Sequence, residues 1–168
     1  MRGFLLDSNV ISELRRPAPS STVRAFLAEQ PEDLLFISEV TYAEIRFGIE
    51  RLGDAGRRAE LDAWLNHTLR PYFGARVLGV TEDVLLRWRL LLEAGRRGGH
   101  TFAQFDLLIA ALAADNDLIV VSRDMTHFVA AGVAILDPWA ARYVSAAGSE
   151  QVVAGLDSPH LLRRLSGQ

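Results

Sequence analysis

Short apolar runs alternate along the chain with segments whose apolar residues recur at helical spacing. Continuous runs of this length are typical of buried strands, and we expect them at residues 3–6, 34–37, 76–80, 118–121 and 133–136. The helical segments between them fall at residues 8–14, 20–29, 39–52, 57–69, 82–95, 101–115 and 125–129. This alternation predicts an α/β fold, a three-layer sandwich in which a small central parallel sheet is flanked by helices.

Polar and helix-breaking residues set the expected helix ends. Thr101 and Gln104 have the spacing of a capping box, so we expect a helix to begin there. We expect Gly53 to end the helix that starts after Ser38. Pro71 is expected to end the next helix, at residues 57–69.

The length of 168 residues is that of one domain of roughly 100–200 residues. After about residue 145 the composition shifts to Ser, Gly and Gln, with one weak helical segment at 161–165. We therefore expect a main domain over residues 1–145 and a C-terminal appendage of unknown role over residues 146–168.

Composition removes several kinds of chemistry. The chain has no cysteine, and all 18 of its Lys and Arg residues are arginines. Thiolate metal sites, cysteine nucleophiles, Schiff bases and a P-loop lysine are thereby excluded. No targeting signal or membrane-length apolar run is visible, so a soluble, cytoplasmic protein is expected.

Four acidic residues are candidates for a functional site because of their positions relative to the predicted strands and helices. Asp7 and Asp124 follow strands, where parallel sheets bind ligands, although either could simply cap the next helix. Asp106 has apolar neighbours on its own helix face, which is costly unless an arginine, a hydrogen bond or a metal ion meets it. Glu44 lies in the middle of a helix and would be unremarkable alone.

Taken together, these acids suggest a metal site. Converging carboxylates repel one another unless protons or cations are present. An all-carboxylate donor set without cysteine favours Mg²⁺ or Mn²⁺, as one or two ions, over zinc.

Four segments, in order, resemble the motifs of PIN-domain nucleases. They are Leu5–Ile11 (LLDSNVI), Tyr42–Ile49 (YAEIRFGI), Phe105–Ala111 (FDLLIAA) and Val121–Asp124 (VSRD) with the following His127-Phe128. The resemblance covers residues 3–137, and its layout is similar to VapC-type toxins of toxin–antitoxin modules, including the FitB-like group.

The resemblance implies a PIN-like fold, a metal-dependent endoribonuclease and an RNA substrate. Asp7, Glu44 and Asp106 match the three usual acids of the family, and Asp124 matches a position that is acidic or Asn. Ser8 matches a hydroxyl residue near the metal, and Ser122 stands where Thr is more common. The resemblance also implies a homodimer and a small DNA-binding, VapB-like antitoxin that joins it in a higher-order complex, with no part played by a membrane.

Arg46, Arg123 and the neighbouring pair Arg96 and Arg97 are candidate contacts to RNA phosphates. We place the pair in the loop before the helix of Asp106, where a solvated face or an internal ion pair is the alternative. The four histidines, at positions 67, 100, 127 and 160, lie on unrelated segments. This scatter argues against a ribonuclease that uses a histidine pair and the 2′-hydroxyl as nucleophile.

Two other functions stay open. A PIN-fold DNA nuclease would use the same acids, because the metal chemistry is indifferent to the sugar. A non-catalytic scaffold that binds RNA or a partner would usually have lost acids, and none is lost here. The RNA target, the number of ions, the identity of the antitoxin and the role of the tail are not encoded in any motif.

Overall fold

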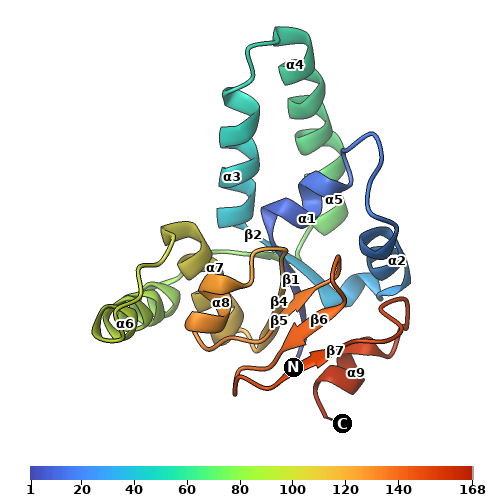
Figure 1. Ribbon diagram of the computed structural model, residues 1–168. Coiled ribbons are helices and arrows are strands. Elements are labelled where there is room, and N and C mark those ends of the chain that lie inside the picture. Colours follow the sequence, from blue (N-terminus) through green and yellow to red (C-terminus); the bar gives the residue numbers. More distant parts are fainter. Residues whose placement is uncertain (168) are drawn as a thin grey trace.

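In the computed structural model, residues 1–167 are described, and they form one seven-stranded sheet with helices on both faces (Figure 1). The strands are β1 (Gly3–Leu6), β2 (Leu35–Ser38), β3 (Val77–Leu78), β4 (Leu118–Val121), β5 (Ile135–Asp137), β6 (Arg142–Val144) and β7 (Glu150–Val152). All five predicted strands are present, with ends that shift by up to two residues.

The order of the strands across the sheet is β3-β2-β1-β4-β5-β6-β7. The first five in this order are parallel, as predicted. The last two run antiparallel, β6 against β5 and β7 against β6, and neither was predicted. Because β1 and β4 are parallel neighbours, Leu6 pairs with Val121 and the residues that follow both strands emerge side by side.

Helical segments connect the strands of the described part of the chain. They are α1 (Ser8–Glu13), α2 (Ser21–Glu29), η1 (Glu32–Leu34), α3 (Glu39–Glu50), α4 (Ala55–Trp64), η2 (Leu65–Leu69), α5 (Arg70–Phe73), α6 (Glu82–Arg97), α7 (Gln104–Asp115), α8 (Thr126–Ala130) and α9 (Leu161–Leu165). Among residues 1–167, no helix is long and apolar enough to cross a membrane.

The sheet has a hydrophobic core on each face, because successive side chains of a strand point to opposite sides. Phe4 and Leu6 of β1 pack into one core with Phe26 of α2. Leu5, between them, packs into the other with Ile109 of α7. Strands that are buried on both faces explain the continuous apolar runs in the sequence, and the predicted three-layer α/β arrangement is confirmed.

Pro71 does not end the helix before it, contrary to the prediction. The chain passes from α4 through the π-helical turn η2 into α5, where Pro71 occupies the first turn. The helical path continues through Pro71 because the π-helical turn directly before it already departs from the regular i→i−4 pattern, where a residue without an N–H is accommodated. The helical path ends instead at Gly74, whose φ of 50° is easy only for glycine.

The boundary between α6 and α7 also differs from the prediction. α6 continues through Gly95 to Arg97, and α7 begins at Gln104 after Ala103, without a capping box. Phe102 is buried against Gly95, where a Cβ would lie 2.1 Å from its ring. This packing fixes the segment before α7 in a non-helical conformation, so Thr101 lies outside the helix.

The segment after residue 145 joins the sheet and the core. β7 pairs with β6, and Arg142 forms an ion pair with Glu150 across the two strands. Beyond β7, Val153, Leu156 and Leu161 are buried in the same core as Phe4 and Phe26. In Figure 1, this segment and α9 lie at the end of the molecule opposite to α3 and α4.

Candidate active site

Asp7 lies where β1 turns into α1, and it is buried. Its Oδ1 accepts the backbone N–H of Ser8 at 2.7 Å, which caps α1. Its Oδ2 accepts the hydroxyl of Ser122 at 2.6 Å and the amide of Asn9 at 2.8 Å. The cap and the candidate site are therefore both built from one carboxylate.

Ser122 and Asn9 tie the ends of β1 and β4 together. The Ser122 Oγ accepts the amide of Asn9 at 2.8 Å and the backbone N–H of Asp124 at 3.1 Å. The Asn9 Oδ1 accepts the backbone N–H of Arg123 at 3.3 Å. Asn9 was not among the predicted site residues. The sequence contains one indication of its role: Asn9 is a polar residue two positions after Asp7, in a helix whose next residues, Val10 and Ile11, are buried in the core.

Glu44, in α3, is half-buried, and its pKa rises to about 7. Burial is the largest cause, followed by the negative charge of Asp7, while a hydrogen bond from the Ser8 hydroxyl acts in the opposite direction. The charge of Asp106 raises this pKa further. Among residues 1–167, the buried Glu44 Oε2 has no hydrogen-bond partner, so one oxygen of this acid is left unsatisfied by the fold.

Asp106, in the first turn of α7, shows the same behaviour. Burial and then the charge of Asp7 raise its pKa to about 6, with a smaller contribution from Asp124. The charge of His127 lowers it. Burial also raises the pKa of Asp7 itself, against the hydrogen bonds from Ser122 and Ser8.

Asp124 is exposed, and its Oδ1 accepts the backbone N–H of Thr126 at 3.4 Å, close to the start of α8. Its charge nevertheless reaches both Asp7 and Asp106. The structure thus brings the four predicted acids, which are separated by up to 117 positions in the sequence, to one edge of the sheet.

The donor set suits a hard divalent cation. Among residues 1–167, no three His, Cys, Asp or Glu side chains are grouped as ligands of one metal ion. Mg²⁺ needs only one or two carboxylates, however, and keeps several of its waters. The buried, unpartnered Oε2 of Glu44 and the raised pKa of each of three neighbouring acids are what a cation would relieve. The chemistry of these residues therefore fits such an ion.

The predicted arginine contacts are placed differently from one another. Arg96 and Arg97 are not in a loop but in the last turn of α6, where positive charge suits the helix dipole. Arg96 pairs with Glu93 at 3.2 Å, as the alternative interpretation expected. Arg123 lies over the ring of Trp139 at 5.5 Å. Arg46 lines a cavity between α3 and α4.

Two of the histidines are not on unrelated parts of the structure. The Nε2 of His100 and the Nδ1 of His127 lie 3.2 Å apart, at hydrogen-bond distance. His100 lies in the loop before α7 and His127 in the first turn of α8, and their separation of 27 positions did not reveal this contact. Scatter along the sequence is thus no argument against a histidine pair, and the reaction products have to decide that question.

The sheet with acids at the carboxyl edge of its parallel part and helices on both faces places the protein in the α/β class, with a candidate metal site at that edge. The PIN domain matches residues 4–132, and the chain belongs to the PIN-domain family. The resemblance found in the sequence motifs is confirmed.

Comparison with individual proteins shows which members of the PIN-domain family this chain is similar to. Over 136 residues, which make up 81% of the chain, it is 35% identical to Toxin FitB of Neisseria gonorrhoeae, of which 98% is covered. It is 33% identical to VapC ribonuclease Y4jK of Sinorhizobium fredii, with 81% of this chain and 97% of the relative covered. The crystal structure of FitAcB from Neisseria gonorrhoeae superposes with a TM-score of 0.78 at 34% identity, covering 81% of this chain and 98% of the other.

Proposed function

We propose that this protein is an Mg²⁺- or Mn²⁺-dependent endoribonuclease and the toxin of a type II toxin–antitoxin pair. The observation that carries the proposal is the acidic cluster of Asp7, Glu44, Asp106 and Asp124, whose charges act on one another at the carboxyl edge of the sheet. The similarity to a relative named as a ribonuclease supports RNA as the substrate.

In this proposal, Asp7, Asp106 and Asp124 hold one or two ions, and Glu44 contributes directly or through a water molecule. A bound divalent ion lowers the pKa of water and neutralises charge on the phosphate. Ser122 and Asn9 hold the Asp7 carboxylate in place through its Oδ2. Ser8 holds its Oδ1 through the backbone N–H.

Cleavage by water leaves a 5′-phosphate and a 3′-hydroxyl, because the 2′-hydroxyl of the RNA does not attack. A histidine-pair mechanism would leave a 2′,3′-cyclic phosphate instead. Chemical identification of the ends therefore separates the acidic cluster from the His100–His127 pair as the catalytic group.

The test is a single carboxylate-to-amide change. Asp106→Asn removes a charge with little change in shape, so we expect cleavage of single-stranded RNA to be lost while the fold is retained. The matched control is Asp115→Asn at the end of the same helix, where Asp115 pairs with Arg87. Wild-type turnover of Asp106→Asn at saturating Mg²⁺ would show that the assignment is wrong.

Equimolar RNA and DNA in one reaction test the DNA-nuclease alternative. Lack of cleavage of either by the wild type would favour a non-catalytic scaffold that binds RNA or a partner.

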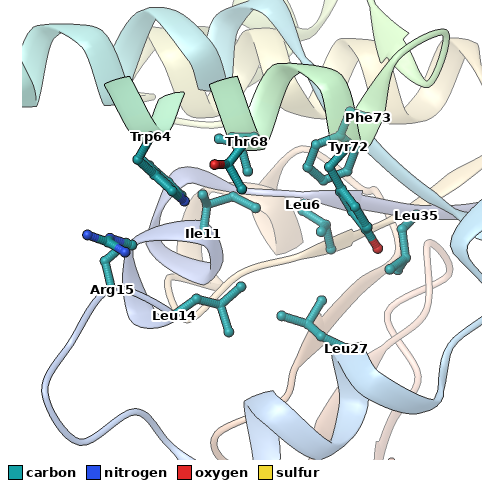
Figure 2. Close-up of a pocket in the computed structure, with 11 residues that line it drawn as sticks. Leu6, Ile11, Leu14, Arg15, Leu27, Leu35, Trp64, Thr68, Tyr72 and Phe73 are labelled. Carbon is teal, nitrogen blue, oxygen red and sulfur yellow. The ribbon is translucent and has the colours of Figure 1, made fainter. Parts of the chain in front are cut away.

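An apolar cavity of about 310 Å³ is a candidate site for the antitoxin. In Figure 2, side chains of α1, α2 and the helical segments from Trp64 to Phe73 point into it, with Arg15 at its rim. Leu14 and Tyr72 line it although each is 42% exposed. A groove of this character suits the apolar face of a helix from a partner.

The relatives support an antitoxin as the partner, since a solved structure 27% identical to this chain is a member of the VapBC family of toxin–antitoxin systems, and FitAB has been solved bound to a DNA fragment. We propose a small DNA-binding, VapB-like antitoxin, in a complex that also contains a homodimer of this chain.

For this partner we expect a Leu14→Asp variant to cleave RNA normally but to escape neutralisation by the antitoxin, which is to be sought among short reading frames next to the gene. The control is Val152→Asp, since Val152 is 85% exposed on β7 and lies outside the cavity. Co-expression and growth provide the measurement, and full neutralisation of Leu14→Asp would exclude this cavity as the docking site.

A further inference from the structure

A second, polar cavity of about 600 Å³ lies between α3 and α4. Arg46, on α3, lines it, whereas Glu44 lines a separate, smaller cavity together with Ser8. Two residues along an α-helix are about 200° apart around its axis. The polar cavity and the acidic cluster therefore lie on different sides of α3, which stands out from the sheet beside α4 in Figure 1.

Three arginines line this cavity from three consecutive helices. They are Arg46 of α3, Arg58 of α4 and Arg70 at the start of α5. Arg58 and Arg70 are partly buried, and the guanidinium of Arg70 lies over the ring of Tyr42 at 4.5 Å. That ring contact holds the Arg70 side chain in one orientation.

Within residues 1–167, none of these three guanidinium groups forms an ion pair. Glu50 and Asp62 also line the cavity, so its cations outnumber its carboxylates by one even when both acids are charged. A partly buried charge without a partner is costly, and an anion from outside the chain would remove that cost.

The geometry points to a site for RNA phosphate groups in this cavity, distinct from the cleavage edge; this inference rests on the proposed ribonuclease function. Arginine presents a planar fork of donors that matches two oxygens of a phosphate. Asn66 lines the same cavity and adds a neutral side-chain amide. An RNA strand cut at the acidic edge would reach the cavity by passing around α3, which is about 10 Å across, so only substrates that extend several nucleotides beyond the cut would use it.

Salt dependence of RNA binding tests this inference in the full-length chain. Binding of a fluorescently labelled 20-nucleotide single-stranded RNA is measured from 50 to 300 mM KCl in an Asp106→Asn background, so that no RNA is cut. For single strands, each phosphate contact contributes roughly 0.7 to the slope of log K against log salt. We expect Arg58→Gln with Arg70→Gln to lower the slope by about 1.4, and the two Lys substitutions to preserve it, since they keep the charges.

The matched control is Arg24→Gln, because Arg24 is an exposed arginine on α2 outside the cavity. Far-UV circular dichroism and the Tm establish that each variant is folded. An unchanged slope in the folded double Gln variant would overturn the inference, as would an equal loss of slope in Arg24→Gln. A loss of slope with polyglutamate but not with RNA would also overturn it, in favour of an acidic protein partner.

The two proposals fail in different ways. If the wild type does not cleave RNA but the slope still depends on Arg58 and Arg70, the nuclease proposal fails while RNA binding at the cavity is supported. If RNA is cleaved and the slope is indifferent to both arginines, the proposed function is supported and the phosphate site is not.

Discussion

At the scale of single residues, the acidic cluster combines two environments. Asp7 is buried with hydrogen-bond donors at both oxygens, while Glu44 and Asp106 are half-buried, with raised pKa values. The difference matters because donors hold Asp7 in one position, whereas Glu44 has one oxygen without a hydrogen-bond partner among residues 1–167. One acid is thus fixed by the fold, and the others can adjust to a ligand.

The raised pKa values predict how stability changes with pH in the absence of divalent ions. In the folded state the pKa of Glu44 is raised from 4.5 to about 7, and the pKa of Asp106 from 3.8 to about 6. Between the lowest and the highest of these values, the folded state therefore binds more protons than the unfolded state. The free energy of unfolding should therefore fall as pH rises from about 4 to 7. Solvent screening at these half-exposed groups limits the change to about 1 kcal/mol.

Urea denaturation in EDTA at several pH values measures this effect. Glu44→Gln should flatten the pH dependence, while Glu29→Gln, at an exposed position on α2, should leave it as in the wild type. A wild-type pH dependence in Glu44→Gln would contradict the raised pKa. Added Mg²⁺ should restore stability at pH 7.5 if it binds only the folded state.

The positions of the acids could be predicted from the sequence, and the family resemblance pointed to Ser8 and Ser122, which donate to Asp7, but the third donor, Asn9, was not predicted. Asp7 and Asp124 follow buried strands, and apolar neighbours single out Asp106 on its helix. The contacts of Asn9 depend on how β1 and β4 pair, and the contact between His100 and His127 depends on how the loop before α7 approaches α8. Such contacts between distant segments leave no periodic signal.

At the scale of elements, helix ends were harder to predict than helices. The capping-box spacing of Thr101 and Gln104 was overridden because Phe102 packs against Gly95. Pro71 was compatible with a helix because the π-helical turn η2 directly precedes α5. Tertiary packing thus determines where α7 begins, and the π-helical turn allows the helix to continue through Pro71. Local helix propensity alone predicts neither.

Two glycine-to-alanine changes separate packing from helix propensity. Alanine favours a helix over glycine by roughly 1 kcal/mol, so Gly48→Ala in α3, where a Cβ meets nothing within 4 Å, should stabilise the protein. Gly95→Ala in α6 should destabilise it by about 1–3 kcal/mol, because the added Cβ would overlap the Phe102 ring. Thermal denaturation of both variants is the measurement, and a stabilised Gly95→Ala would mean that Phe102 packs elsewhere.

At the scale of the whole molecule, the sheet has a parallel part and an antiparallel part. The PIN domain match ends at residue 132, and the parallel strand β5, the antiparallel strands β6 and β7, and α9 follow it. The parallel part was predictable from its apolar runs. β7 was not, because Glu150, Gln151 and Val152 are all exposed and carry no buried-strand pattern.

The C-terminal segment should contribute strongly to folding stability. Leu161 is fully buried in the core beside Phe26, and Leu161→Ala should cost about 2–5 kcal/mol. Val152→Ala, at an 85% exposed position, should change stability by less than about 0.5 kcal/mol. Urea denaturation of the two full-length variants compares them, and equal stabilities would show that the segment is not packed on the core.

The double role of the Asp7 carboxylate limits which substitutions this position can accept during evolution. This carboxylate caps the first helix and also belongs to the acidic cluster, so a drift to alanine at this codon would weaken folding and chemistry together. Asparagine caps a helix about as well as aspartate, so a substitution of Asp7 by Asn is the change by which a descendant could lose the proposed cleavage and keep its fold.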